Sequence, residues 1–461
     1  MKKGYSILIL LCCVAPWARG QAVLTRGDAD LLYAVQDESE WQKFTVPPQW
    51  TYFSLPFPIF VNRHGRYMAD VQSDALRPAG YQNYPQYFVD PIQGADSNPG
   101  TSRTRPFRSM SRALEIDGNK WVLCRPGLYP FTQSWRGATP EGNTVVEPWD
   151  DSGRIVSSGR MTHNAWTPGV SHTYTHIGAT FTNQVIDHKS RDQWGNGVRY
   201  RRMQTVAEVM ATPGSFCVNG KSTTLRTFDG RVPDADILLL TGQQNGRFDD
   251  NAHLYVRGVD FEGGSRPFAA LTDNNDAGQV IVFDDCTFQY AIEHQDGLTS
   301  DGPGTTYLFQ SHATGNAADG FDYKNGRRFV EVNCIGSGNG HDTVPEGEPL
   351  DNGSTAHVNC VGLTINGLYA DNRGRNIHDV IDSRRMILGS QVGFSRGTIL
   401  ASADIAAGTG DSDRTFTFLI HLRYLGGSSY ARQCALSSRM YSRGHLSAQA
   451  DFQYGETIFP L

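Results

Sequence analysis

The sequence has no excess of basic residues and few charged residues of any kind. Lysine and arginine number 41 against 47 acidic residues, and charged residues make up 19% of the 461 positions. A nucleic-acid-binding domain normally presents a basic surface to the phosphate backbone. The composition therefore predicts that nucleic acid is not a partner.

Long hydrophobic runs are missing after the first residues. Lys2 and Lys3 precede a short apolar run at 7–14, and small residues follow at 18 and 20. This pattern predicts a secretory signal peptide over 1–20. No later run approaches the roughly 20 apolar residues that a transmembrane helix needs. We therefore expect a periplasmic or extracellular protein with no membrane insertion.

Closely paired cysteines are also missing. Of the 8 cysteines, Cys12 and Cys13 fall within the predicted signal peptide, and the other positions show no CxxC spacing. This spacing disfavours a zinc site, which usually needs such pairs. Disulfides are allowed in an exported protein, but the sequence does not define their connectivity.

Glycine, in contrast, is abundant at 49 residues, and it separates short strand-like segments that repeat. These segments recur roughly every 21 to 27 residues, which is typical of a β-solenoid. They are 254–259, 280–286, 307–312, 329–334, 356–360 and 377–382. Each begins with alternating apolar residues and ends in a Gly/Asn-rich turn, which predicts the stacked coils of an all-β parallel β-helix. Cys286, Cys334 and Cys360 fall at similar places in this alignment and are expected to stack inside as small apolar groups.

Other segments frame this repeat. Residues 21–85 are aromatic and proline-rich, and we expect a lead-in that packs on the main body. A short amphipathic helix near Pro106 is expected to cap the exposed end of the first coil, in a β-helix domain spanning 86–400. Residues 145–250 predict inserted hairpins with turns at Asn219-Gly220 and Asp229-Gly230. The insertion is either a strut or an arm that contacts substrate. Residues 401–461 predict a C-terminal β cap.

The segment from Tyr87 to Tyr129 resembles the opening of the pectate-lyase-like right-handed parallel β-helix superfamily. The likeness lies in Tyr-Phe-Val-Asp-Pro at 87–91, Gly-Ala-Asp-Ser-Asn-Pro-Gly-Thr at 94–101, Pro-Phe-Arg-Ser-Met at 106–110 and Arg-Pro-Gly-Leu-Tyr at 125–129. It covers only about residues 86–130. The resemblance implies a right-handed β-helix whose partner is a polysaccharide.

Polar residues follow several of the repeated strands and predict a site. Equivalent positions in successive coils lie about 4.8 Å apart, so such residues form ladders. His294 and Asp296, then Asp319, Asp322 and Lys324, then His341 and Asp342, and finally Asp371 are expected to share one face. Stacked carboxylates need a metal, a proton or a basic neighbour. We therefore predict a metal site at Asp296, Asp319 and Asp322, with calcium as the candidate ion. The alternative is that these aspartates merely end strands in turns.

Within this ladder, Asn-Ala-Ala-Asp-Gly-Phe-Asp-Tyr-Lys at 316–324 is similar to a segment of pectate lyases that use a lysine base. The resemblance implies that Lys324 is the base and Asp319 an acidic residue near calcium. Elimination needs a base at C5 of a uronate and a cation at its carboxylate. One coil later the chain has Gly-His-Asp-Thr at 340–343, where that family carries a second acidic signature.

The sequence leaves three functions open. The first is a secreted polysaccharide lyase with Lys324, Asp319, Asp322, His341 and Asp342 as catalytic residues. The second is a glycoside hydrolase that uses paired aspartates. The third is a non-catalytic glycan-binding or structural β-helix. Imidazoles transfer protons and arginines clamp carboxylates, so substrate contacts are predicted at His312, His357, Arg373, Arg375 and His378.

Overall fold

The computed structural model describes residues 41–460 with internal gaps. These gaps are 53, 55, 64, 163–164, 179, 193, 273–276, 293, 341–350, 397–402, 409–412, 426–427, 429, 435–437, 444–451 and 454–457. The predicted signal peptide, His341 and Asp342 therefore lie outside the described residues. Among the residues that are described, no helix has the length and apolar character needed to cross a membrane.

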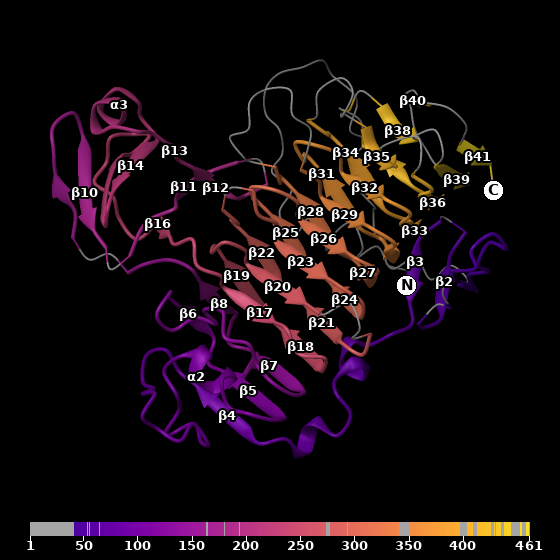
Figure 1. Cartoon of the computed structure of the whole chain (residues 1–461), viewed down its shortest axis with the longest axis horizontal. Helices are drawn as coiled ribbons and strands as arrows, with labels where there is room; N and C mark the ends of the chain where they lie inside the picture. The colour runs from indigo at the N-terminus through magenta and orange to yellow at the C-terminus, as the bar shows by residue number, and fades with distance from the viewer. Residues whose placement is uncertain are drawn as a thin grey trace, which may run out of the picture.

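Each coil of the main body contains three short strands that pair with the same strands of the next coil. One coil consists of β24 (Thr305–Phe309), β25 (His312–Thr314) and β26 (Phe321–Lys324). All three pair in parallel with the coils before and after. Three parallel sheets therefore run along the molecule, and Figure 1 shows the coils stacked from the indigo to the yellow end. The chain forms the predicted right-handed parallel β-helix.

We name each sheet after its strand in this coil. The β24 sheet also holds β4 (Gln86–Val89), β5 (Lys120–Cys124), β7 (Thr144–Pro148), β18 (His253–Arg257), β21 (Val280–Asp284), β27 (Arg328–Val332), β30 (Val361–Ile365), β33 (Arg384–Leu388), β36 (Phe416–Ile420), β39 (Arg439–Arg443) and β41 (Ile458–Pro460). The β25 sheet also holds β6 (Gly127–Tyr129), β8 (Ile155–Ser158), β19 (Val259–Glu262), β22 (Thr287–Gln289), β28 (Ile335–Ser337), β31 (Leu368–Ala370), β34 (Gln391–Gly393) and β37 (Arg423–Tyr424). The β26 sheet also holds β17 (Gly246–Phe248), β20 (Phe268–Leu271), β23 (Leu298–Asp301), β29 (Ser354–His357), β32 (Ile377–Val380), β35 (Ala403–Ala407), β38 (Tyr430–Cys434) and β40 (Phe452–Gln453).

The cysteines are buried free thiols, as predicted, but their predicted alignment was wrong for one of them. Cys286 and Cys334 occupy the same corner, with Ser311 in register between them. Cys360 lies at another corner, between β29 and β30, in register with Arg327. The repeated segments 356–360 and 377–382 belong to the β26 sheet, whereas the earlier ones begin in the β24 sheet. All three strands of a coil alternate alike, so periodicity does not distinguish the sheets.

The first coil is covered by the predicted short helix. Helix α2 (Met110–Leu114) begins a few residues after Pro106, because the Ser109 side chain accepts the Arg112 N–H and caps the helix there. The apolar face of α2, with Met110 and Leu114, is buried in the main core. The lead-in forms a small antiparallel sheet of β1 (Gln42–Lys43), β2 (Ile59–Val61) and β3 (Tyr67–Ala69). Residues of this lead-in pack on the β24 sheet, as the contact of Trp50 with Phe418 shows.

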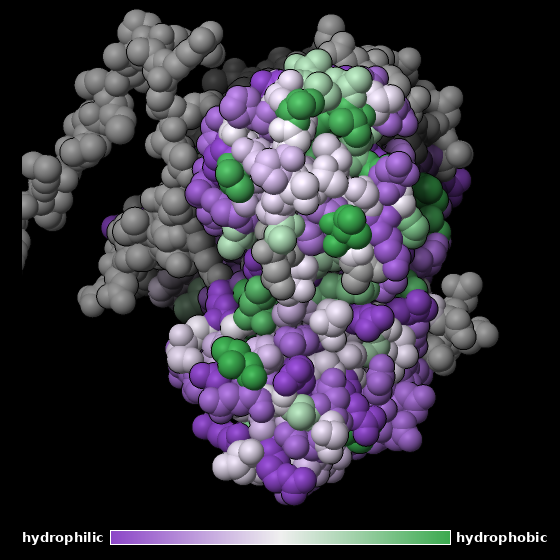
Figure 2. Space-filling view, turned by 90° about the vertical axis from the view of Figure 1, so that its left-hand side faces the viewer, coloured by the Kyte–Doolittle hydropathy of each residue, from purple (hydrophilic) through white to green (hydrophobic). Residues whose placement is uncertain are grey.

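Residues 161–242, here called the arm, project from one side of the stacked coils of the β-helix (Figure 1). The arm contains β9 (Thr167–Pro168), β10 (Thr173–Ile177), β11 (Gln184–Arg191), β12 (Gly197–Arg199), β13 (Arg201–Arg202), α3 (Val206–Ala211), β14 (Ser215–Asn219), β15 (Ser222–Arg226) and β16 (Ile237–Leu240). The predicted hairpin at Asn219-Gly220 is confirmed by the pairing of β14 with β15. The second predicted hairpin was wrong, because β15 already pairs with β14 and β10, and β16 pairs with β11. Apolar residues on this side are scattered among polar ones (Figure 2).

The strands after residue 400 continue the coils. β35 and β38 extend the β26 sheet, and β36 and β39 extend the β24 sheet, all with parallel pairing. The separate cap expected over 401–461 is therefore replaced by further coils in the residues described there. Phe416 and Phe418 pack against Tyr52 and Trp50 of the lead-in. A sequence pattern alone does not distinguish such a strand from a cap strand.

Candidate functional site

A ladder of buried asparagines forms the corner between the β25 sheet and the β26 sheet. The Asn316 side-chain amide donates to Asn339 Oδ1 at 2.9 Å, and the Asn339 amide donates to Asn372 Oδ1 at 2.9 Å. All three are buried, where an unpaired amide would be costly. This ladder fixes the turns that lead from Asn316 into β26 and from Asn372 into β32, and so positions the residues that begin those strands.

The register of these strands brings polar residues onto one face. Two residues before the paired residues Leu298, Phe321, Ser354 and Ile377, a first ladder runs through Asp296, Asp319, Asn352 and Arg375. A second ladder runs through Thr299, Asp322, Thr355 and His378, and a third through Asp301, Lys324, His357 and Val380. The predicted grouping of Asp296, Asp319, Asp322 and Lys324 on one face is therefore confirmed, while their chemical roles stay predictions.

Lys324 is held between two carboxylates. Its ammonium pairs with Asp322 Oδ2 and lies 3.5 Å from Asp296 Oδ2. Burial alone would lower the pKa of Lys324, but the charges of Asp322 and Asp296 raise it above its ordinary value. The lysine is therefore the counter-charge that the stacked aspartates require.

Asp322 is the most buried carboxylate of the group, with its side chain 1% exposed. Burial raises the pKa of Asp322 well above its usual range, and the charge of Asp296 adds to the shift, while Lys324 opposes it. Its Oδ1 lies 3.5 Å from His357 Nε2 and accepts no hydrogen bond from the described residues. A buried oxygen of this kind is available to a proton or a cation.

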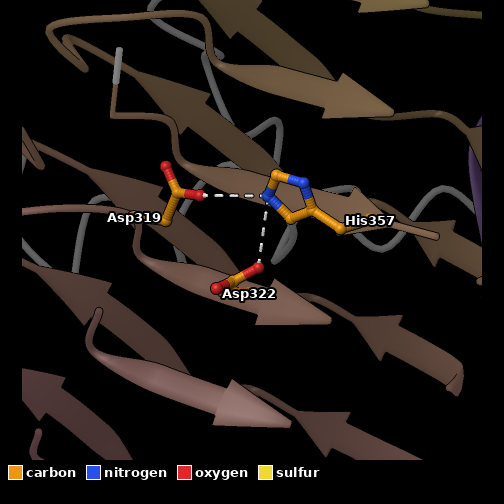
Figure 3. Close-up of side chains that lie close together, drawn as sticks. All are labelled: Asp319, Asp322 and His357. Carbon is orange, nitrogen blue, oxygen red and sulfur yellow. Dashed lines mark ion pairs between the residues drawn. The ribbon is translucent and has the colours of Figure 1, made fainter. Parts of the chain in front are cut away.

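Asp319 lies in a more polar setting. Its Oδ1 accepts the backbone N–H of Asn352 at 2.5 Å and the Asn352 side-chain amide at 3.1 Å. Its Oδ2 lies 4.0 Å from His357 Nε2. Figure 3 shows both carboxylates converging on the same ring nitrogen of His357. The imidazole side chain is 33% exposed, whereas the two carboxylates that it faces are 10% and 1% exposed.

This arrangement fits a cation. Ligand atoms of Asp319, Asp322 and His357 all lie within 4.8 Å of one another. Asp322 Oδ1 is a buried oxygen that accepts no hydrogen bond from the described residues, so it can serve as a metal ligand. Asp296, the third predicted ligand, is adjacent through its contact with Lys324. The three carboxylates suit calcium, whereas the imidazole is a donor that zinc and other transition metals use. The identity of the ion stays a prediction.

Arg375 and His378 lie on the same face, beyond Asn352 and Thr355. The Arg375 guanidinium donates to Gln433 Oε1 at 3.2 and 3.0 Å, and its Nη1 is 3.5 Å from His378 Nδ1. Burial lowers the pKa of Arg375 to about 10. Burial also lowers the pKa of His378 well below its usual value, and the charge of Arg375 adds to that shift. His378 is therefore neutral beside a charged arginine.

The other predicted residues do not join this group. His312 begins β25 and pairs with Thr287 and Ile335, so it belongs to the β25 sheet, and its predicted place beside the acids was wrong. Asp371 accepts the Trp194 indole N–H and pairs with Arg396, which ties it to the arm. Arg373 lies in the corner, next to Gly340.

An ion network inside the coils escaped the sequence analysis. Glu331 is fully buried and accepts hydrogen bonds from Tyr323, Ser354, Thr364 and Tyr369. Arg385 pairs with Asp379 at 2.8 Å and donates to Ser354. Tyr323, Ser354 and Asp379 are the inward residues of β26, β29 and β32, so the network holds the three strands that carry the site. The signal in the sequence was a charged residue at a position where the alternation of the strand predicts an inward side chain, because a buried charge needs a partner.

Comparisons with known proteins gave structural likenesses only. Neither protein-family models nor curated proteins matched the chain. A solved complex of XylC with xylose is similar at 9% identity and a TM-score of 0.47, covering 79% of this chain and 76% of that one. A glycoside hydrolase has 10% identity and a TM-score of 0.43, with 80% and 94% covered. Pectate lyase Pel9A has 10% identity and a TM-score of 0.35, with 81% and 77% covered. Likenesses this distant carry no argument about activity.

Proposed function

We propose that the protein is a polysaccharide-degrading enzyme that cleaves a uronate-containing glycan by β-elimination at the face of β26 and β29. The observation that carries the proposal is which side chains of this face are exposed and which are buried. Lys324 and His357, neighbours across the two strands, are the partly exposed ones, with side chains 31% and 33% exposed. The carboxylates lie beneath them. The segment 316–324, with its likeness to lysine-base pectate lyases, supports the same reaction.

Elimination needs basic groups at the substrate, whereas glycoside hydrolysis needs two carboxylates that reach the scissile bond. The side chain of Asp322 is 1% exposed and that of Asp319 10% exposed. Carboxylates this deep hold and polarise the groups above them more readily than they contact a glycosidic oxygen. The exposed groups, in contrast, are an imidazole that can accept a proton and an ammonium that carries a positive charge. The geometry therefore favours elimination over hydrolysis.

Within this reaction His357 is proposed as the proton acceptor and Lys324 as the protonated partner. The resemblance implied Lys324 as the base, but that role requires loss of a proton that Asp322 and Asp296 hold in place. Imidazoles are the side chains that most often transfer protons in enzymes, and His357 Nε2 faces the carboxylates of Asp319 and Asp322, which orient the ring. The ammonium of Lys324 faces the same space and can balance negative charge on the uronate.

A cation, if bound, would be held by Asp319 and Asp322 with Asp296. It would neutralise the charge of the substrate carboxylate, and this neutralisation makes the C5 proton more acidic. A cation there would compete with the Lys324 ammonium for the oxygens of Asp322.

Hydrolysis remains the second candidate because of one observation. The environments of Asp322 and Asp319 differ: burial raises the pKa of Asp322, whereas Asp319 accepts two N–H groups from Asn352. Carboxyl groups in contrasting environments are the usual acid and base pair of a glycosidase.

The test is a panel of purified uronate and neutral glycans incubated with the full-length protein. Ultraviolet absorbance measures unsaturated product ends, and a reducing-end assay measures all cleavage. We expect both signals to rise together on a uronate polymer. Reducing ends without unsaturated ends would replace the lyase by the hydrolase, and no cleavage of any glycan would leave a binding protein.

A further inference from the structure

Arg375 carries a charge that no carboxylate of the described residues balances. Its Nε and Nη2 donate to one neutral amide oxygen, Gln433 Oε1, and its remaining contact is with His378. Burial is what lowers the pKa of Arg375 to about 10. Guanidinium stays protonated in proteins, and a buried charge without a partner is costly. An anion from outside the described residues would offset that cost.

Other buried arginines are arranged differently. Arg385 pairs with Asp379 at 2.8 Å, and Arg231 pairs with Asp187 at 2.7 Å. Arg327 has no carboxylate partner among the described residues, but it is fully enclosed and donates to Thr306, Gln279 and a backbone carbonyl. Its donors are satisfied in the interior, where no ligand could reach. Arg375 is partly exposed, and its guanidinium fork has capacity left.

The position of Arg375 relates it to the proposed site. Asn352 connects the two, since its backbone N–H donates to Asp319 and its Oδ1 accepts the backbone N–H of Arg375. Arg375 is two strands from Asp319 in the same ladder, which places their backbones about 10 Å apart. A glycan that lies across the strands at Lys324 and His357 would thus carry a neighbouring sugar past Arg375.

We propose that Arg375, with His378 beside it, forms a subsite for an anionic substituent on a sugar next to the one being cleaved. This inference rests on the proposed function and extends it to the substrate: the glycan carries an acidic group there as well. A guanidinium binds a carboxylate or a sulfate through two parallel N–H groups. The shared chemistry is an oxyanion, and the experiment separates its two sources.

The experiment compares the wild type with Arg375→Gln, Arg375→Lys and Arg328→Gln. Arg328 is an exposed arginine of β27 in the β24 sheet, so its variant removes the same charge from a different face. Affinity electrophoresis is run in polygalacturonate, alginate, carrageenan as a sulfated glycan without carboxylates, methyl-esterified polygalacturonate and neutral galactan. The esterified polymer and the galactan report contacts that do not involve charge.

We expect Arg375→Gln to weaken binding of an acidic polymer about ten- to hundred-fold, with binding of the two neutral polymers unchanged. Arg375→Lys should keep part of the affinity, and Arg328→Gln all of it. Loss confined to polygalacturonate or alginate identifies a carboxylate, and loss confined to carrageenan identifies a sulfate. Unchanged affinity in Arg375→Gln, an equal loss on acidic and neutral polymers, or no acidic binding by the wild type would each overturn the subsite.

Thermal unfolding separates binding from a structural role. Removing an unbalanced charge should leave the unfolding midpoint of Arg375→Gln equal to or above that of the wild type. A lowered midpoint would mark Arg375 as structural and overturn the proposal. If the wild type cleaves a glycan without any dependence on Arg375, the subsite fails alone. If the wild type neither binds nor cleaves any glycan of the panel, the proposed function fails with it.

Discussion

Replacing Arg385 by leucine should destabilise the coils that carry the site. Arg385 is fully buried between Asp379 and Glu331, and its Nη1 also donates to Ser354 at 2.9 Å. Burial alone would lower the pKa of Arg385, but the two carboxylates raise it above its ordinary value. Among the described residues, the variant leaves the Asp379 side chain with one hydrogen-bond donor, the Thr417 hydroxyl at 2.9 Å.

Removing one partner of a buried ion pair typically costs 3–5 kcal/mol, because it leaves a buried charge without compensation. Glu331 keeps its four hydroxyl donors in the variant, so the loss falls mainly on Asp379. We therefore expect the free energy of unfolding to fall by about 3 kcal/mol near neutral pH. Arg328→Leu, on the exposed surface of β27, should change it by less than about 0.5 kcal/mol.

The loss of unfolding free energy in Arg385→Leu, here called the deficit, should also depend on pH. Burial raises the pKa of Asp379 in the folded state, and the variant loses the cation that opposes this shift. A group whose folded-state pKa is raised favours folding in its protonated form, so stability is lost as pH rises through that pKa. The deficit of Arg385→Leu should accordingly shrink between about pH 7 and about pH 4. Urea unfolding followed by circular dichroism measures both effects. A deficit equal to that of Arg328→Leu, or one that grows on acidification, would refute the reasoning.

Three further predictions concern the site. Lys324→Ala should lower turnover by about 10²- to 10⁴-fold, whereas Lys324→Arg should keep most of it because the charge is retained; equal loss in both would identify Lys324 as the base. His357→Gln should lower kcat by a similar factor with KM little changed, in steady-state assays on the best glycan of the panel, and a change in KM alone would show that His357 only binds. Exhaustive chelation should lower activity and added calcium should restore it, and full activity after chelation would contradict a role for a cation at Asp319 and Asp322.

The fold could be predicted from the sequence because its signals are local. The spacing of the strands, the glycine-rich turns and the opening segment at 87–129 each indicated a β-helix, and the motif at 316–324 indicated where polar residues gather. The alignment failed where two sheets share one pattern: Cys360 and His312 were assigned to the wrong side, because each coil contains three strands with similar alternation.

Other features depend on register across coils and were not visible locally. Asn352 stands in the same ladder as Asp319, yet the two are separated by a segment longer than the usual coil spacing. Glu331, Asp379 and Arg385 look like surface residues in a polar sequence, and only the inward direction of their side chains makes them a network. The strands after 400 pair at spacings that vary from 18 to 32 residues, which hides their repeat in the sequence.

The central claim is that this face cleaves a glycan by elimination, and product analysis in ¹⁸O-labelled water tests it most directly. Elimination breaks the bond without adding water, so the new ends should carry no ¹⁸O, and one product should be unsaturated by mass spectrometry. Wild type should give such products and His357→Gln should give almost none. Products that together gain one water for each cleaved bond, with ¹⁸O at the new reducing end, would contradict the account and assign the site to hydrolysis.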